Sequence, residues 1–307
     1  MEGEALRLLA GLPEGARLLV AVSGGADSVA ALRLMLSVAD RARVAVEAAN
    51  CNFHLRGEEA DRDSRFVSDL CAELEVRLHA VGFDTREWMR LNPGNSLEMA
   101  CRRLRHDWFD SLMAEEDFCR LVTGHNSGDN AETLFLNLLR GAGVNGLKGM
   151  IPDDGRVLRP LLGFSRREIL EYLARIGQDF VTDSSNLSSD YRRNFLRNDV
   201  LPLLASRWEG LDTALRHSQE LLRRENRILQ HFIREALPAE GAPLSWHAIN
   251  AFPDPETLIF HFIRPFGGSS CIAAEIARSL PRPETGKRWH LASGRIALAT
   301  RRGLKIE

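Results

Sequence analysis

The stretch 18–28, LLVAVSGGADS, constrains the fold of this chain more than any other. Its apolar run over 18–22 has no polar alternation, which predicts a strand buried on both faces of a parallel sheet. The run ends at SGGADS, and an Ala- and Leu-rich helical stretch follows over 29–38. Glycines let main-chain N–H groups approach a ligand, and a helix start adds unpaired donors and a positive dipole end. The stretch therefore predicts an α/β fold with a phosphate-binding loop.

Ordinary helix capping is the competing interpretation of this loop, because Ser, Gly and Asp are also typical residues before a helix. The full SGGADS string after an apolar strand favours the phosphate. The chain has no GxxxxGK[ST] string, and the loop itself has neither a lysine nor the GxGxxG pattern. A Walker-type or dinucleotide-binding loop is therefore not predicted.

Composition indicates a soluble protein of the cytoplasm. The chain of 307 residues is 44% hydrophobic and 27% charged, and it is long enough for more than one domain. No apolar stretch approaches the ~20 residues that cross a bilayer, and residues 1–12 show no signal-peptide pattern. The five cysteines are widely spaced and form no CxxC pair. We therefore expect reduced thiols, no zinc or iron–sulfur site and no membrane partner.

Charge differs mildly between the two parts of the chain. Residues 1–150 hold 17 Lys and Arg against 23 Asp and Glu, whereas the remaining residues hold 23 against 19. The second part therefore permits contact with a phosphate backbone but does not demand it.

Strand-like and helical stretches alternate after the loop. Strands are expected over 43–49, 76–81 and 120–123, and helices over 58–74, 96–116 and 129–139. The alternation predicts a parallel, doubly wound sheet with helices on both faces. In such sheets ligands bind at the carboxyl ends of the strands. Polar clusters that follow predicted strands are therefore candidate binding residues.

One such cluster contains Asn52, His54 and Arg56, for which an ordinary polar loop is the alternative. A second lies on a helix, where Glu98, Arg102 and Arg105 share one face, so that Glu98 can pair with Arg102. Two guanidiniums on one face suit a polyanion or a developing phosphoryl charge. A solvated charged face is the alternative interpretation.

A third cluster follows the strand over 120–123 and contains Gly124, His125, Asp129 and Glu132. Carboxylates beside a triphosphate site are suited to Mg²⁺, which favours one or two carboxylates together with phosphate oxygens. Asp27 and Asp129 are the metal candidates. Simple capping of the next helix is the alternative for Asp129.

Later segments suggest further contacts and a domain division. A mobile glycine-rich loop with Lys148 is expected over 141–149, a short edge strand over 158–162, and a helix capped by Ser165. A serine-rich loop is followed by Arg192, Arg193, Asn194 and Arg197. Such side chains suit the recognition of phosphate and ribose, or a structural network that links two domains. We expect a catalytic domain over 1–205, a helical linker over 206–240 and a small α+β domain over 241–307.

These motifs, in this order, resemble the tRNA(Ile)-lysidine synthases, a family of the N-type ATP pyrophosphatase (PP-loop) superfamily. The matching pieces lie within residues 17–205: SGGADS, NFHLRGEE, EMACRRLRH, TGHNSGDNAET, RGAGVNGLKGM, LRPLL and the DSSN…RRNFLRNDVLPLL segment. The chain departs from the family at three positions: Gly128 replaces the first of two usual Asp, Asn130 a Gln and His106 a Tyr. Longer members continue into a further tRNA-binding domain, so we expect a short or truncated form.

The resemblance implies a fold of the PP-loop ATPase type and a two-step ligation. ATP adenylates C2 of the wobble cytidine in a CAU anticodon, and free L-lysine then displaces AMP to form lysidine, which changes the codon read from AUG to AUA. ATP, Mg²⁺, tRNA(Ile) and L-lysine are the implied ligands, and a homodimer is an open option. The implied ATP contacts are Ser23, Gly24, Gly25, Asp27, Ser28, Asn52, His54, Arg56, Gly124 and His125. The implied catalytic residues are Asp27, Arg102, Arg105, Asp129 and Glu132, and the implied tRNA contacts are Lys148, Arg192, Arg193, Asn194 and Arg197.

Two alternatives share the loop. A PP-loop tRNA thiolase generally needs a CxxC pair or a catalytic cysteine, and the chain has no CxxC. A catalytically impaired tRNA-binding relative has Gly128 as its only support in the sequence.

Overall fold

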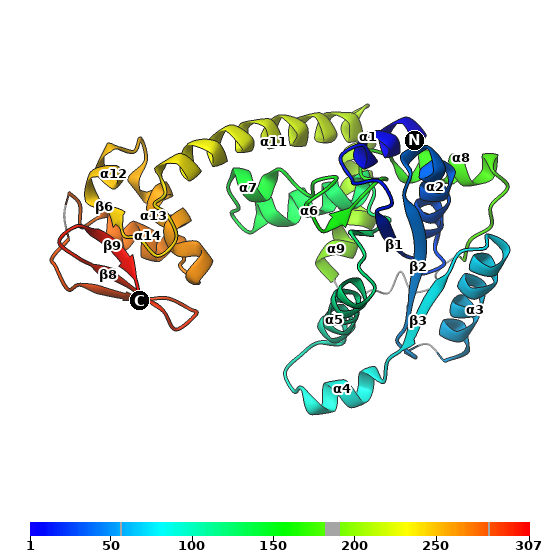
Figure 1. The fold of residues 1–307 in the computed structure, drawn as a ribbon. Coiled ribbons are helices and arrows are strands. Elements are labelled where there is room, and N and C mark those ends of the chain that lie inside the picture. Colours follow the sequence, from blue (N-terminus) through cyan, green and yellow to red (C-terminus); the bar gives the residue numbers. More distant parts are fainter. Residues whose placement is uncertain (56, 182–190, 282) are drawn as a thin grey trace. The chain divides into compact units, whose positions relative to one another are not determined.

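The first part of the chain is built on a parallel sheet of five strands (Figure 1). The computed structural model describes residues 1–55, 57–181, 191–281 and 283–307. The strands are β1 (Arg17–Ala21), β2 (Ala45–Asn52), β3 (Leu78–Gly82), β4 (Arg120–Val122) and β5 (Val157–Leu158), in the order β3-β2-β1-β4-β5. All neighbouring pairs are parallel.

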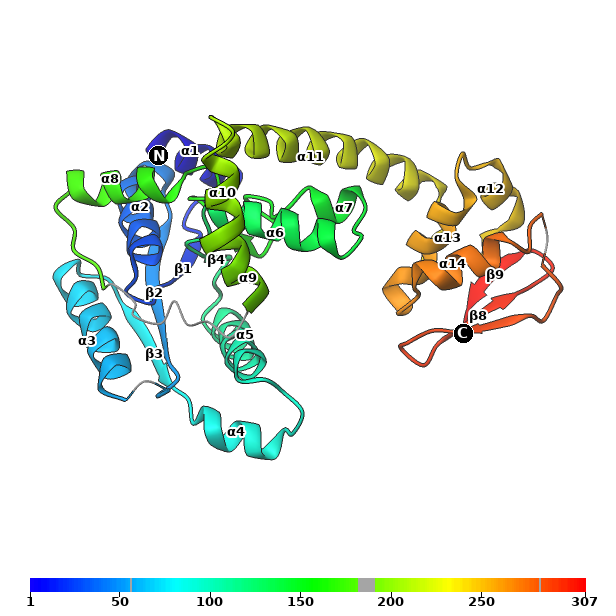
Figure 2. The ribbon, with the colours of Figure 1, turned by 180° about the vertical axis from the view of Figure 1, so that it is seen from behind.

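Both faces of this sheet are covered, as the sequence predicts. Successive residues of β1 point to opposite faces: Leu18 and Val20 belong to one buried cluster, and Leu19 to another. The first cluster includes residues of α1 (Glu2–Leu9), α2 (Ala26–Ala42), α3 (Glu58–Glu73) and α8 (Arg166–Arg175), and the second includes α5 (Leu97–Glu115). Figures 1 and 2 show α3 and α5 on opposite sides of the strands. The doubly wound α/β fold is therefore confirmed.

The sheet has its topological switch between β1 and β4. From β1 the chain adds β2 and β3 on one side, and then returns to add β4 and β5 on the other. A crevice opens at the carboxyl ends of the two strands where the order reverses, and it is the usual ligand site of open α/β sheets. The SGGADS loop follows β1, and the TGH segment follows β4.

Local predictions differ from the structure at several places. The expected edge strand over 158–162 has two residues only, Val157–Leu158, because Pro160 has no N–H for the sheet and turns follow. The expected mobile loop over 141–149 contains a short helix, α7 (Val144–Leu147). The helices α1 and α4 (Thr85–Leu91) are among those that the sequence analysis did not predict. The DSSN motif, at 183–186, lies outside the described residues.

The remaining helices of the first part are α6 (Ser127–Leu139), α9 (Tyr191–Phe195), the π-helix η1 (Leu196–Val200) and α10 (Leu201–Ala205). Two of the predicted caps can be compared directly. Ser165 accepts from Glu168 N at the start of α8, and Ser96 accepts from Met99 N at the start of α5, so both caps are confirmed.

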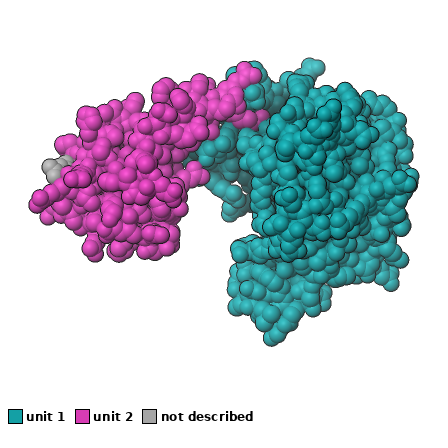
Figure 3. All heavy atoms as spheres, viewed as in Figure 1, with its two compact units in different colours: residues 1–222 teal, residues 223–307 magenta. Residues whose placement is uncertain are grey.

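The chain divides into two compact units, Met1–Leu222 and Arg223–Glu307 (Figure 3). The long amphipathic helix α11 (Leu211–Ala236) belongs partly to each unit. The second unit also contains α12 (Trp246–Ala251), α13 (Pro255–Ile263) and α14 (Ser270–Ala277). An antiparallel sheet accompanies them, of order β6-β9-β8-β7, with strands Leu244–Ser245, Gly303–Ile306, Ile296–Ala299 and Arg288–His290.

The second unit has its own buried core, which includes Trp246, Ile259 and Trp289, and the small α+β module is confirmed. The domain boundaries at 205 and 240 stay predictions. Within the described residues, none of the helices is both long enough and apolar enough to cross a membrane.

Candidate nucleotide-binding site

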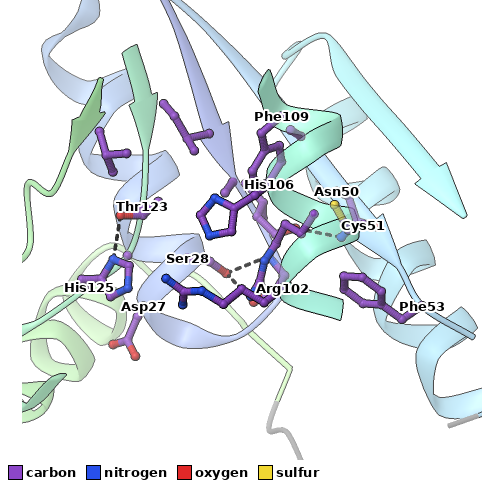
Figure 4. Close-up of a pocket in the computed structure, with 18 of the residues that line it drawn as sticks. Asp27, Ser28, Asn50, Cys51, Phe53, Arg102, His106, Phe109, Thr123 and His125 are labelled. Carbon is purple, nitrogen blue, oxygen red and sulfur yellow. Dashed lines mark hydrogen bonds between the residues drawn. The ribbon is translucent and has the colours of Figure 1, made fainter. Parts of the chain in front are cut away.

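A cavity of about 790 Å³ lies at the carboxyl ends of the strands in the first unit (Figure 4). Its walls include the ends of β1, β2 and β4, the starts of α2, α3 and α6, and the middle of α5. Figure 4 shows Asp27, Arg102, His106 and His125 around this space. The volume is typical of a site for a small-molecule ligand or cofactor.

The SGGADS loop is shaped by its own hydroxyl groups. Ser23 N donates to Ser28 Oγ at 3.1 Å, and Ser28 Oγ donates to Gly25 O at 2.9 Å. Gly24 has a φ of +90°, which a residue with a side chain rarely adopts. The loop leads directly into the 17-residue helix α2, whose first N–H groups have no partner within the helix. This arrangement suits an anion.

Gly124 brings the loop after β4 against the start of α2. A Cβ at Gly124 would lie 2.7 Å from the carbonyl carbon and oxygen of Asp27, and 2.9 Å from Ser28 N. Only a glycine permits this approach of two backbones, which sets the TGH segment beside the anion-binding loop.

Asp27 is a partly buried carboxylate in the cavity lining. Burial raises its pKa, the Arg166 guanidinium opposes that rise, and the nearby carboxylate of Asp129 adds to it. Arg166 Nη1 lies 2.6 Å from Asp27 Oδ1. Both carboxylates line the cavity. Two carboxylates beside an anion-binding loop fit Mg²⁺, which takes its other ligands from phosphate and water.

The α5 wall supplies positive charge. Arg102 and Arg105 both line the cavity and are exposed to solvent. They therefore lie on the same face of the helix, as the sequence predicts. His106 lines it too, and burial, reinforced by the two guanidiniums, lowers its pKa. A neutral His106 leaves the positive charge of this wall on the arginines.

The start of α6 supplies His125 and Asp129. His125 Nδ1 lies 2.8 Å from Thr123 Oγ1, and burial lowers the pKa of this histidine. Asn126 caps the helix, and Asp129 completes a capping box by accepting from Asn126 N at 3.0 Å. The capping interpretation of Asp129 is therefore confirmed, and its other oxygen accepts from Arg197 Nη2 at 2.8 Å.

Glu132 lies behind the cavity rather than on its wall. Only 2% of its side chain is exposed, and burial raises its pKa, against the effect of the arginines beside it. Arg197 Nε lies 2.6 Å from Glu132 Oε1, and Arg193 Nε lies 3.0 Å from Oε2. Two residues that the sequence analysis assigned to tRNA thus neutralise one that it assigned to catalysis. Of these three residues, Arg193 also lines the cavity.

The other predicted residues divide between the cavity and the surface. Asn52 lines the cavity, and its Nδ2 donates to Asp61 Oδ1 at 2.9 Å. His54 is exposed and lies 3.4 Å from the same carboxylate, outside the lining. Lys148, Arg192 and Asn194 are also outside the lining. Arg56 lies outside the described residues.

The lining also includes residues to which the sequence analysis gave no individual role: Asn50, Cys51, Phe53, Thr123 and Arg159. The first four lie at or just after the ends of β2 and β4, which was the available signal. Asn50 Nδ2 donates to Val22 O at 2.7 Å and so joins the ends of two neighbouring strands. Arg166 was missed too, because its contact with Asp27 joins segments far apart in the sequence.

The strand order and the anion-binding loop at the switch point define a nucleotide-binding α/β domain. Residues 2–204 match the family model described as the PP-loop domain, and the chain belongs to this family.

The chain is also similar to curated proteins with a named function. The tRNA(Ile)-lysidine synthase of Bacteroides thetaiotaomicron is 38% identical over 290 residues, which are 92% of this chain and 66% of that protein. The tRNA(Ile)-lysidine synthase of Porphyromonas gingivalis strain W83 is 40% identical over 277 residues, 88% of this chain and 59% of that protein. These similarities confirm the resemblance seen in the motifs. The chain spans less than two thirds of the length of either relative.

A solved structure is similar in fold. The U34-tRNA thiolase NcsA from Methanococcus maripaludis, with its 4Fe-4S cluster, superimposes with a TM-score of 0.60. The match covers 72% of this chain and 78% of that one, at 18% sequence identity, and concerns the fold alone.

Proposed function

We propose that this chain forms lysidine in tRNA(Ile). In this proposal it is an ATP-dependent ligase that adenylates C2 of the wobble cytidine of a CAU anticodon and then joins free L-lysine. The observation that carries the proposal is the convergence of the SGGADS loop, Arg102, Arg105 and Asp129 on one cavity. The names of the curated relatives support the substrate.

The SGGADS loop and the start of α2 would hold the β- and γ-phosphates of ATP. Main-chain N–H groups and the helix dipole favour the negative charge there. Asp27 and Asp129 would hold Mg²⁺, which when bound would neutralise phosphate charge. The raised pKa of Asp27 fits a carboxylate whose cation is supplied together with the nucleotide.

Arg102 and Arg105 would stabilise the α-phosphate as the cytidine O2 attacks phosphorus and pyrophosphate leaves. Adenylation turns O2 into part of a leaving group, so that the amine of lysine can form the new C2–N bond while the C2–O bond to AMP breaks. The amine gives up its protons to solvent. Catalysis would come from positioning and from charge stabilisation. The cytidine has to leave its stack to reach the cavity.

The assignments of Lys148, Arg192 and Asn194 to tRNA stay predictions. For Arg193 and Arg197, the ion pairs with Glu132 support a role in holding α9 and η1 against α6 beside the cavity. A cytoplasmic location and a homodimer also stay predictions.

Lysine transfer tests the proposal directly. The chain is incubated with ATP, Mg²⁺, labelled lysine and tRNA(Ile) with a CAU anticodon, and elongator tRNA(Met) is the matched control. We expect label in tRNA(Ile) alone, with one AMP and one pyrophosphate released per lysine. Pyrophosphate release without lysine transfer would contradict the ligase.

The thiolase alternative receives less support. Cys51 is the cysteine in the cavity lining, and burial raises the pKa of its thiol to about 12. It is therefore protonated and a poor nucleophile at neutral pH. The impaired relative is opposed by the intact cavity and by Asp129, which lines it beside the changed position, Gly128.

A further inference from the structure

Helix α6 is held from both sides of the face that it turns toward the cavity. With 3.6 residues per turn, Asp129 and Thr133 share that face, and Asn130 and Glu132 lie on either side of it. Glu132 binds the two arginines of α9 and η1. Asn130 faces α11.

The contact between α6 and α11 is a reciprocal pair of buried amides. Asn130 Nδ2 donates to Gln219 Oε1 at 2.8 Å, and Gln219 Nε2 donates to the main-chain oxygen of Asn130 at 3.0 Å. The two residues are 2% and 1% exposed, respectively. One turn earlier on the same side of α6, Ser127 Oγ donates to Asp212 Oδ1 at 2.9 Å. A buried amide that loses its partner is costly, so these contacts fix the register of the two helices.

The side-chain amide of Asn130 also contacts a residue of the cavity wall. Asn130 Oδ1 accepts from Met150 N at 2.8 Å, and Met150 lines the cavity. The residue before it, Gly149, has a φ of +66° and packs on the pair: a Cβ there would lie 2.4 Å from Asn130 Oδ1 and 2.5 Å from Gln219 Nε2. The pair therefore holds three segments together: α6, α11 and the end of the glycine-rich stretch.

We propose that Asn130 and Gln219 are positioning residues of the active site, which set Asp129, Thr133 and Met150 in the cavity from outside it. The inference rests on the proposed function for its kinetic readout. Neither side chain lines the cavity, so neither is expected to contact ATP. A displacement of about 1 Å at a reacting centre is enough to lower turnover by about 100-fold.

Gln219→Leu tests the proposal, because it keeps the size of the side chain and removes both hydrogen bonds. Gln219→Glu is the second variant, since it keeps the acceptor for Asn130 Nδ2 and removes the donor alone. Asn226→Leu is the matched control: it removes a buried amide seven residues further along the same helix, whose Oδ1 has no hydrogen-bond partner. A double variant that exchanges the two residues, Asn130→Gln with Gln219→Asn, tests for rescue, because it keeps the combined length of the two side chains.

We expect both Gln219 variants to lower kcat for lysine transfer about tenfold or more, with a KM for ATP within about twofold of wild type. Amide hydrogen exchange over 127–133 and at Met150 is expected to become faster, whereas the control leaves kcat and this exchange unchanged. The exchanged pair is expected to recover more activity than either of its single changes. Wild-type kcat and wild-type exchange in a folded Gln219→Leu protein would overturn the proposal. If the wild-type chain transfers no lysine, the proposed function fails, and unchanged exchange over 127–133 in the variants would still refute the role of the pair.

Discussion

Replacing Gly124 by alanine should impair the active site far more than it impairs the fold. The new Cβ would lie 2.7 Å from the carbonyl group of Asp27, whereas ordinary contacts begin near 3.4 Å, so one backbone must move by about 0.7 Å. The obstacle is main chain and cannot rotate away. Both segments that would separate line the cavity.

Overpacking of this kind costs about 1–3 kcal/mol of unfolding free energy. A displacement approaching 1 Å between the phosphate loop and the TGH segment should lower pyrophosphate release by about 10- to 100-fold. Activity is measured as pyrophosphate release with saturating tRNA, and stability by urea unfolding. Gly163→Ala is the control, because a Cβ at Gly163 meets nothing within 4 Å. A Gly124→Ala protein with wild-type turnover would refute the close approach as a requirement of the site.

Three further predictions concern charge. Glu132→Ala removes the buried side chain that pairs with two partly exposed arginines, and we expect a loss of about 2 kcal/mol in urea unfolding; an unchanged midpoint would contradict the ion pairs. Asp27 has a raised pKa in the folded state, so its contribution to stability is present below its unfolded pKa and is lost as the pH rises through its folded pKa. Asp27→Asn should therefore abolish pyrophosphate release while leaving the unfolding free energy at pH 7 equal or higher, with a flatter dependence on acid pH; a less stable variant at pH 7 would be the opposite result. At pH 8 iodoacetamide should modify exposed Cys271 well before Cys51, whose pKa is raised to about 12, and mass spectrometry of the peptides would show the reverse if Cys51 were a thiolate.

Several cavity-lining residues that the sequence predicts lie in local sequence patterns at the ends of parallel strands. The apolar run of β1 is a pattern of consecutive residues, and the loop follows it directly in the sequence. Parallel topology then places the end of β4 beside the end of β1, which makes Ser28 and His125 neighbours of one cavity. Local patterns and one topological rule are enough for these residues.

No local sequence pattern shows which residues far apart in the chain form ion pairs with each other. Arg193 and Arg197 were assigned to tRNA because cations suit phosphate, yet both lie against Glu132, about 60 residues away in the chain. The helical period of α6 shows that Glu132 leaves the face of Asp129, but it does not show which segment fills that direction. The predicted length of the strand over 158–162 was wrong for a local reason, since Pro160 cannot donate to the sheet and turns follow it.

The cavity-facing residues of helix α6 do not act alone, because the helix is held by several contacts. Its 13 residues begin with a capping box that uses Asp129, the same carboxylate accepts from Arg197, and the next residue, Asn130, pairs with Gln219. Each contact approaches from a different direction around the helix, so rotating or shifting α6 to relieve one contact strains another. A change at position 130 or 132 should therefore alter the environment of Asp129 without touching the nucleotide. Kinetic effects of such changes should be non-additive with those at Asp129, because they act through the same carboxylate.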